Sequence, residues 1–248
     1  MNISVVMAYH NRRKQLLKTL DSIRYFGNPE IIIVDDASDE RIDDIRDITL
    51  IRIEPEQKKW VNSCIPYNIG FAKAKGDVII IQNPECIHIG DILKYTENLK
   101  EGIVFSHGAY SLDYHLDYEG YDFDSLKYLI MKEPQRCQIE HHGWYNHSKY
   151  RPAGYHFCMS MTRTDLEKLG GFDETYAKGV GFEDDDLVRR IKKAGMNLQI
   201  IDDPFVIHQK HKRTNYMGIW DKRMLNNDLF LKAGNGPIKS QNNKYYGF

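Results

Sequence analysis

The stretch ISVVMAYHNRRKQLLKTLDSIRYFGNPEIIIVDD, residues 3–36, decides the fold. Its first apolar run predicts a short buried strand. Leucine and isoleucine then recur on one helix face over residues 16–23, and we expect Asn11 to cap this helix and Gly27 to end it. The second apolar run completes a β-α-β unit. Its two parallel strands end at the same edge of the sheet, where ligands of such sheets bind.

The rest of the chain continues the alternation of strands and helices. Tyr, His and Asp crowd together without a regular period at 107–155, so we expect an irregular insertion or lid there. The pattern as a whole predicts an α/β fold with a mostly parallel sheet. The other predicted elements are strands at 49–53, 77–81, 155–161, 198–201 and 205–208, and helices at 66–75, 164–169, within 181–195 and at 219–232.

The composition excludes some classes of function. The chain has 248 residues, of which 42% are hydrophobic and 28% charged, which suits one globular α/β domain with elaborations. Its 34 Lys and Arg balance its 35 Asp and Glu, so no basic field favours nucleic acid as a partner. No apolar run approaches the roughly 20 residues that span a bilayer, and no signal-peptide pattern is present. We expect a cytoplasmic protein, at most peripheral to a membrane, with four reduced cysteines.

Polar residues follow two of the predicted buried strands. Asp35 and Asp36 can accept hydrogen bonds from a nucleobase or a ribose, or can form a turn that caps the next helix. Asn83-Pro84-Glu85 follows the fourth strand. Glu85 can hold a divalent cation against a pyrophosphate, although Asn-Pro also commonly opens a turn. Taken alone, each pattern leaves both interpretations open.

His208 ends the last predicted strand and is followed by the basic segment 209–213. An imidazole can complete the ligand shell of a divalent cation and favours Mn²⁺ over Mg²⁺. The neighbouring cations could hold phosphate oxygens, but a solvated basic turn explains the same residues.

The strongest feature is the acidic run Glu-Asp-Asp-Asp at 183–186. Acids in the first turn of a helix complement its dipole, each by about 0.3–1 kcal/mol. Four successive carboxylates exceed that need, and their mutual repulsion raises the pKa of at least one toward that of a general base. Gly179 and Gly181 would let the backbone just before them approach a substrate closely.

The aromatic pair Trp144-Tyr145 lies in the segment without a regular period. Its rings could stack on sugar rings, or could only pack this segment onto the domain. Both interpretations stay open at this point.

In this order, the motifs resemble those of family 2 glycosyltransferases with the GT-A fold. The matching segments are 4–12 (SVVMAYHNR), 34–38 (VDDAS), 68–72 (NIGFA) with 76–77 (GD), and 83–85 (NPE). The segments 171–174 (GFDE) and 183–187 (EDDDL) with Arg190 are similar to the acceptor half of β-1,4-galactosyltransferases and chondroitin-polymerase-type enzymes. The resemblance covers residues 3 to about 213, apart from most of 105–150.

The resemblance implies a GT-A fold, with a Rossmann-like, mostly parallel central sheet flanked by helices and an irregular insertion on the acceptor side. It implies a nucleotide-sugar-binding half at 1–104 and an acceptor-binding and catalytic half of the same domain at 105–213. Residues 214–248 would form a C-terminal extension.

The resemblance also suggests roles for individual residues. Ala8 and Asp36 would hold the nucleobase and ribose, and Asn68 would belong to the donor pocket, which we expect Tyr9, Asn11, Asp35 and Asn83 to complete. Glu85 and His208 would bind Mn²⁺ or Mg²⁺, with Mn²⁺ favoured, although the family usually shows two acids where this chain has Asn83-Pro84-Glu85. Asp184 would be the general base. Glu183 would bind or orient the acceptor, with Asp185, Trp144 and Tyr145 beside it.

We therefore expect an inverting, metal-dependent glycosyltransferase that moves a sugar from a nucleotide-sugar donor, with UDP-sugars favoured, to a hydroxyl of a glycan, glycoconjugate or lipid-linked sugar. Polysaccharide biosynthesis is the corresponding process. One alternative is a sugar nucleotidyltransferase, which would carry a Gly-rich basic loop after the first strand, whereas residues 9–13 contain bases and no glycine. The other is a catalytically inactive carbohydrate-binding relative, which would have lost the acids.

Overall fold

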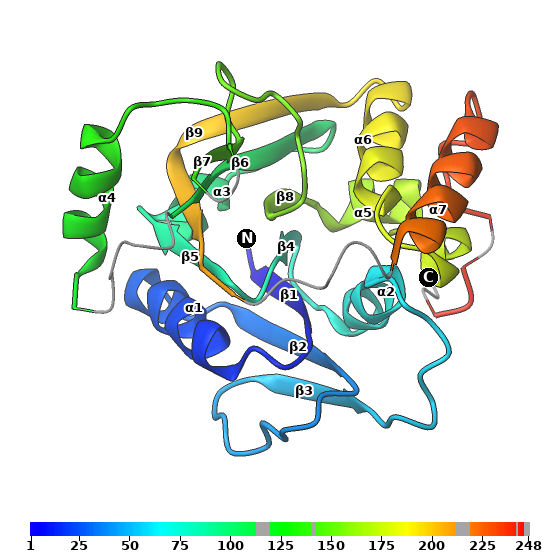
Figure 1. Cartoon of the computed structure of the whole chain (residues 1–248), viewed down its shortest axis with the longest axis horizontal. Coiled ribbons are helices and arrows are strands. Elements are labelled where there is room, and N and C mark those ends of the chain that lie inside the picture. The colour runs from blue at the N-terminus through cyan, green and yellow to red at the C-terminus, as the bar shows by residue number, and fades with distance from the viewer. Residues whose placement is uncertain (113–119, 140–141, 212–218, 242, 246–248) are drawn as a thin grey trace.

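The computed structural model describes residues 1–112, 120–139, 142–211, 219–241 and 243–245 (Figure 1). Within these ranges, nine strands form one sheet in the order β3-β2-β1-β4-β8-β6-β9-β5, with β7 paired to β6. The strands are β1 (Ile3–Tyr9), β2 (Glu30–Asp36), β3 (Thr49–Ile53), β4 (Val78–Gln82), β5 (Cys86–Ile89), β6 (Ile103–Ser111), β7 (Gly143–Asn146), β8 (Cys158–Thr162) and β9 (Asn197–His208). The helices are α1 (Arg13–Phe26), α2 (Cys64–Lys73), α3 (Ile92–Thr96), α4 (Phe123–Lys132), α5 (Arg163–Leu169), the 3₁₀ helix η1 (Glu174–Lys178), α6 (Glu183–Lys193) and α7 (Trp220–Ala233).

The predicted β-α-β unit is confirmed, and with it the α/β fold with a mostly parallel sheet. β1 pairs in parallel with β2 on one side and with β4 on the other, and β3 adds in parallel to β2. β8 runs antiparallel to β4 and to β6, and β5 runs antiparallel to β9. The carboxyl ends of β1, β2 and β4 therefore meet at one edge of the sheet, as the sequence predicts.

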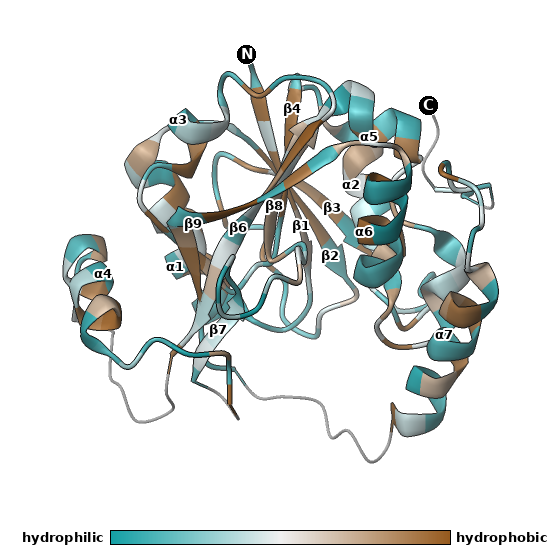
Figure 2. Cartoon of the chain, turned by 90° about the horizontal axis from the view of Figure 1, so that it is seen from above, coloured by the Kyte–Doolittle hydropathy of each residue, from teal (hydrophilic) through white to brown (hydrophobic). Residues whose placement is uncertain are grey.

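Helices cover both faces of the sheet. Val6 and Ile32 pack among buried residues of α2, α5 and α6, whereas Val5 and Ile33 pack among those of α1 and α3. This alternation follows from the two-residue period of a strand, which turns successive side chains to opposite faces. Figure 2 shows α1 and α3 on one side of the fanned strands and α2, α5 and α6 on the other. No helix among the described residues is both long and apolar enough to cross a bilayer.

The predicted helix cap at Asn11 is wrong. Helix α1 begins at Arg13 after Arg12 in the N-cap position, and no side chain caps it. Asn11 has a φ of 51° in the left-handed region. Its side chain instead donates to Asp39 and accepts from the Asp39 backbone N–H, each over 2.8 Å, so it ties the end of β1 to the loop after β2.

The segment 107–155 contains more regular structure than we expected. β6 runs on to Ser111, and α4 and β7 lie within the segment. Residues 106–111 (SHGAYS) of β6 are all buried, with β9 along one side of the strand and β8 and then β7 along the other, so no polar and apolar alternation marks it in the sequence. The strand pieces expected on either side of Pro204 form one strand, β9, with a register shift opposite 107–109 of β6.

Asp186, the last residue of the acidic run, is structural. Its carboxylate accepts a 2.7 Å hydrogen bond from Nε of Arg190, and both side chains are 1% exposed. Arg190 also donates to the carbonyl oxygens of Leu169 and Gly171, over 2.7 and 2.9 Å. The buried pair thus joins α6 to the turn after α5.

Replacing Asp186 by Asn should lower the free energy of unfolding by about 3–5 kcal/mol, because it leaves the buried guanidinium of Arg190 without its counter-ion. Urea unfolding followed by circular dichroism would measure the loss. Asp185→Asn, one residue earlier on the same helix and half-buried, should change stability far less. Equal stabilities of the two variants would contradict this role of Asp186.

Candidate active site

A cavity of about 430 Å³ lies at the carboxyl edge of β1, β2 and β4. The loop before α2, the loop before β8 and the start of α6 complete its walls. The described residues of the cavity wall include seven of the residues that we expected in the site, which are Ala8, Tyr9, Asp36, Asn83, Glu85, Glu183 and Asp184. Residues from both halves of the sequence therefore face one space.

Glu183 and Asp184 form the acidic side of this cavity. Nδ2 of Asn62 donates a 2.6 Å hydrogen bond to Oε2 of Glu183. The Asp185 backbone N–H donates to Oδ1 of Asp184 over 2.9 Å. Burial and the neighbouring Asp184 charge raise the pKa of Glu183 to about 7, and burial also raises the pKa of Asp184. The two carboxyl groups form a pair that holds a proton far more readily than free carboxylates do.

A tight turn positions the start of α6. Gly181 and Phe182 both have left-handed backbone angles, with φ of 71° and 69°. Nδ2 of Asn226 on α7 donates to the Gly181 carbonyl oxygen over 2.7 Å. The ring of Phe182 lies 5.8 Å from that of Phe230, also on α7. Helix α7 thus supports the turn that carries the acidic pair.

The two glycines before the acidic run have different roles. Gly181 lines the cavity, as expected for a close approach of the backbone to a ligand. Gly179 does not line the cavity. It faces α7 so closely that a Cβ there would lie 2.1 Å from Oδ1 of Asn226. Its lack of a side chain makes room for α7 rather than for a substrate.

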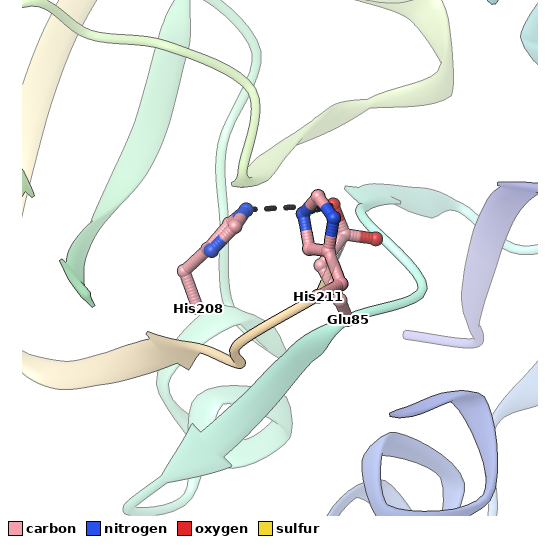
Figure 3. Close-up of side chains that lie close together, drawn as sticks. All are labelled: Glu85, His208 and His211. Carbon is pink, nitrogen blue, oxygen red and sulfur yellow. Dashed lines mark ion pairs between the residues drawn. The ribbon is translucent and has the colours of Figure 1, made fainter. Parts of the chain in front are cut away.

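Glu85, His208 and His211 form the candidate metal site. Oε1 of Glu85 lies 3.5 Å from Nε2 of His208 and 3.7 Å from Nε2 of His211. Figure 3 shows the three side chains converging from the turn before β5 and from the end of β9. Their potential ligand atoms all lie within 4.8 Å of one another, which no other such group does among the described residues.

Strand register explains why these residues meet. Cys86 of β5 pairs with His208 of β9, and the Gln209 backbone N–H donates to the Glu85 carbonyl oxygen over 2.9 Å. Oε2 of Glu85 is buried and has no hydrogen-bond partner in the structure. A buried carboxylate together with two imidazoles, which approach its other oxygen, Oε1, is a donor set that suits Mn²⁺.

Arg12 also contacts Glu85, with Nη1 2.7 Å from Oε1. Burial alone would raise the pKa of Glu85. The hydrogen bond from His208 and the charges of Arg12, His208 and His211 outweigh burial and hold that pKa below its usual range. Glu85 is therefore an ionised carboxylate at neutral pH.

Asp36, which also lines the cavity, is held by two donors. Nε1 of Trp60 donates to Oδ1 and Nζ of Lys58 donates to Oδ2, both over 2.8 Å. The ring of Trp60 lies 5.6 Å from that of Tyr245, near the C-terminus. The carboxylate of Asp36 is thereby fixed where it can accept a further hydrogen bond from a ligand.

Three residues that we expected in the donor pocket lie outside the cavity. Asp35 is fully buried, pairs with Arg52 over 2.5 Å and accepts from the Ser38 backbone N–H, so it supports the turn after β2. Asn68 is fully buried and bonds to both the N–H and the carbonyl of Phe172 over 2.9 Å. Asn11 bonds to Asp39, as described above. These three residues support the pocket structurally and do not line it, which corrects their expected place in the donor pocket.

The expected acceptor contacts also need correction. Trp144 is 1% exposed, donates from Nε1 to Gln135 and packs edge-on against Tyr110 and Phe205, so no sugar can stack on it. Tyr145 is buried beside Phe157 and His208. Asp185 does not line the cavity and receives a 3.4 Å hydrogen bond from the Tyr155 hydroxyl. Tyr155 itself lines the cavity.

Sequence reasoning missed several residues that the fold brings to the cavity. They include Arg12, Lys58, Asn62 and His156 in the wall and His211 beside Glu85. The spacing of His208 and His211 could have indicated a second imidazole ligand. Nothing in the sequence indicates His156, whose pKa burial lowers to about 4, so that its ring is neutral.

Comparison with known families agrees with this geometry. Glycosyl transferase family 2 matches residues 4–151, more than half of the chain, so the protein belongs to this family. A second family, described as the N-terminal domain of galactosyltransferase, matches residues 136–212. The suspected family and its galactosyltransferase-like segment are thus confirmed. A comparison with functionally curated proteins found no match.

Three solved structures illustrate the similarity of fold. A TarS fragment from S. aureus in complex with UDP-GlcNAc has a TM-score of 0.59 at 14% identity, over 86% of this chain and 60% of that one. The catalytic domain of Drosophila β1,4-galactosyltransferase 7, in complex with xylobiose, has a TM-score of 0.51 at 16% identity, over 90% and 80%. The mannosyltransferase PcManGT from Pyrobaculum calidifontis, in complex with GDP-Man and Mn²⁺, has a TM-score of 0.51 at 16% identity, over 88% and 59%.

These similarities establish the GT-A type of fold for this chain. It spans about 60% of the TarS fragments and 37% of the longer TarS chain.

Proposed function

We propose that this protein is an inverting, metal-dependent glycosyltransferase that moves a sugar from a UDP-sugar to a hydroxyl of a glycan or glycoconjugate. One observation carries the proposal. The carboxyl pair of Glu183 and Asp184 and the carboxylate of Glu85, which lies beside His208 and His211, face the same cavity. A base and a leaving-group site within one space are what a displacement at an anomeric carbon requires.

In the proposed step, Asp184 accepts the proton of the acceptor hydroxyl as that oxygen bonds to the anomeric carbon. The bond from that carbon to the diphosphate oxygen breaks on the opposite face, and the configuration inverts. Glu85, His208 and His211 would hold Mn²⁺ or Mg²⁺, which supplies neutralising charge to the departing diphosphate. Glu183, held by Asn62, positions the acceptor hydroxyl beside Asp184.

Asp36 supports the assignment of the donor. It lies at the end of β2, in the place where nucleotides bind to such sheets, and Trp60 and Lys58 fix both of its oxygens. Two structures with the same fold were solved with UDP-GlcNAc and with GDP-Man. We favour a UDP-sugar.

Incubation with a panel of nucleotide sugars and Mn²⁺ tests the proposal against its two alternatives. A glycosyltransferase releases the nucleoside diphosphate, even without acceptor through slow hydrolysis. A sugar nucleotidyltransferase would consume or release pyrophosphate, and an inactive carbohydrate-binding relative would release neither. Absence of diphosphate release with every donor, with and without glycan acceptors, would refute the proposed activity.

The pH dependence of transfer should report the acidic pair. Since the pKa of Glu183 is raised to about 7 and that of Asp184 is also raised, the pair takes up a proton as pH falls through about 7. The pair then shares a proton and less of Asp184 is ionised, so kcat/KM should fall on the acidic side of this value. In Glu183→Gln the neighbouring negative charge is absent, and the acidic limb should move to lower pH. A limb that stays in place in this variant would show that the pair does not control the rate.

A further inference from the structure

The contact between Arg12 and Glu85 suggests a role for Arg12 beyond the cavity wall. Arg12 stands directly before α1, and its side chain is 33% exposed and lines the cavity. The Glu85 side chain is only 4% exposed. The guanidinium therefore reaches a buried carboxylate from a position that also opens to the cavity.

The three partners of Glu85 converge on a single oxygen. Nη1 of Arg12 lies 2.7 Å from Oε1, and Nε2 of His208 and of His211 lie 3.5 and 3.7 Å from the same atom. Oε1 is thus the oxygen that faces both imidazoles. A divalent cation bound by the two imidazoles would bond to this oxygen, at the position where the guanidinium now donates.

We propose that Arg12 is a tethered counter-ion that competes with the divalent cation for Glu85. When the guanidinium holds Oε1, the buried carboxylate is charged and stays directed toward His208 and His211. When a cation binds, Arg12 gives up this hydrogen bond and its charge turns to the open side of the cavity. Arg12 is therefore a positioning residue that lowers the affinity for the cation while keeping its site formed. This inference rests on the metal site of the proposed function.

Three possible roles of Arg12 predict different changes in cation binding. A merely structural role would make cation binding weaker when Arg12 is replaced, because the site would lose its order. Competition predicts the opposite sign. A general repulsion between the cation and nearby positive charge would also make cation binding stronger when Arg12 is replaced. It would have the same effect when the neighbouring Arg13 is replaced. Arg13 pairs with Asp44 and is not among the residues that line the cavity, so it serves as the matched control.

The experiment is calorimetric titration of Mn²⁺ into the wild-type protein and into Arg12→Gln, Arg12→Lys and Arg13→Gln. Arg12→Gln should bind Mn²⁺ about tenfold more tightly, since one charge-assisted hydrogen bond no longer has to break. Arg12→Lys keeps the positive charge but lacks the planar guanidinium group. Its affinity for Mn²⁺ should lie between those of Arg12→Gln and the wild type. Arg13→Gln should match the wild type.

Thermal unfolding gives a second readout. With EDTA, Arg12→Gln should melt below the wild type, because Glu85 keeps a buried charge with fewer partners. Saturating Mn²⁺ should then raise its melting temperature by more than it raises that of the wild type. Arg12→Lys should show the same pattern to a smaller extent, so the test does not depend on Arg12→Gln being well folded.

The outcomes also separate this inference from the proposed function. Equal or weaker Mn²⁺ binding by Arg12→Gln, or an equal gain by Arg13→Gln, would overturn the competition and leave the metal site intact. Mn²⁺ binding to neither the wild type nor the variants would overturn both the competition and the metal site. Diphosphate release in the donor assay tests the proposed transfer independently of either result.

Discussion

Replacing Asp184 by Asn should lower the rate of sugar transfer by about 10²–10⁴-fold while leaving donor binding nearly unchanged. The substitution keeps the shape of the side chain and its ability to accept the 2.9 Å hydrogen bond from the Asp185 backbone N–H. It removes the negative charge of the side chain and with it the ability to take a proton. Because Asp36 and Glu85 are contributed by other elements of the cavity wall, contacts to the nucleotide should persist.

Two measurements check this expectation. Single-turnover kinetics with a saturating donor would give the loss of rate, and calorimetric titration with UDP would show whether binding is preserved. Asp185→Asn is the comparison, because Asp185 contacts Tyr155 and lies outside the cavity wall, and it should cost far less activity. An active Asp184→Asn enzyme would refute the assignment. A greater loss in Glu183→Gln than in Asp184→Asn would move the role of base to Glu183.

The fold could be predicted because its information is local. The apolar runs of β1, β2 and β4 are continuous, and the helix between the first two has a clear apolar face. The order of these elements then fixes a right-handed crossover and a common ligand edge. Asp36 and Glu85 stand just after strand ends, so their approach to one cavity follows from topology. The acidic run, at a helix start, was expected there only from the family resemblance.

The residues that escaped prediction depend on pairings far apart in the chain. Arg12 and Glu85 are brought together by the parallel pairing of β1 and β4, and His211 approaches Glu85 through the antiparallel register of β5 and β9. Asn226 supports the turn at Gly181 across 45 residues. A polar side chain gives no local sign of such a partner. The same limit explains why Asp35 and Asn68, which match the family motifs, are structural supports here.

The metal site gives the second large effect. Replacing Glu85 by Gln should reduce Mn²⁺-dependent transfer by about 100-fold or more, since charge stabilisation by a bound cation contributes several kcal/mol to such a step. The carboxylate is the only acid of the group formed with His208 and His211 among the described residues. Gln keeps the volume of the side chain and removes its charge. The partly exposed Arg12 can turn to solvent, so the fold should tolerate the change.

The decisive measurement is the affinity for UDP with and without Mn²⁺, combined with activity in EDTA. In the wild type, Mn²⁺ should strengthen UDP binding, and EDTA should abolish both this gain and the transfer. In Mn²⁺, Glu85→Gln should show the UDP affinity and transfer activity that the wild type shows in EDTA. EDTA should have little further effect on the variant, because EDTA and the substitution remove the same interaction. Additive losses from EDTA and from the substitution would place the cation elsewhere. An unchanged Mn²⁺-dependent affinity for UDP in Glu85→Gln would exclude Glu85 as its ligand.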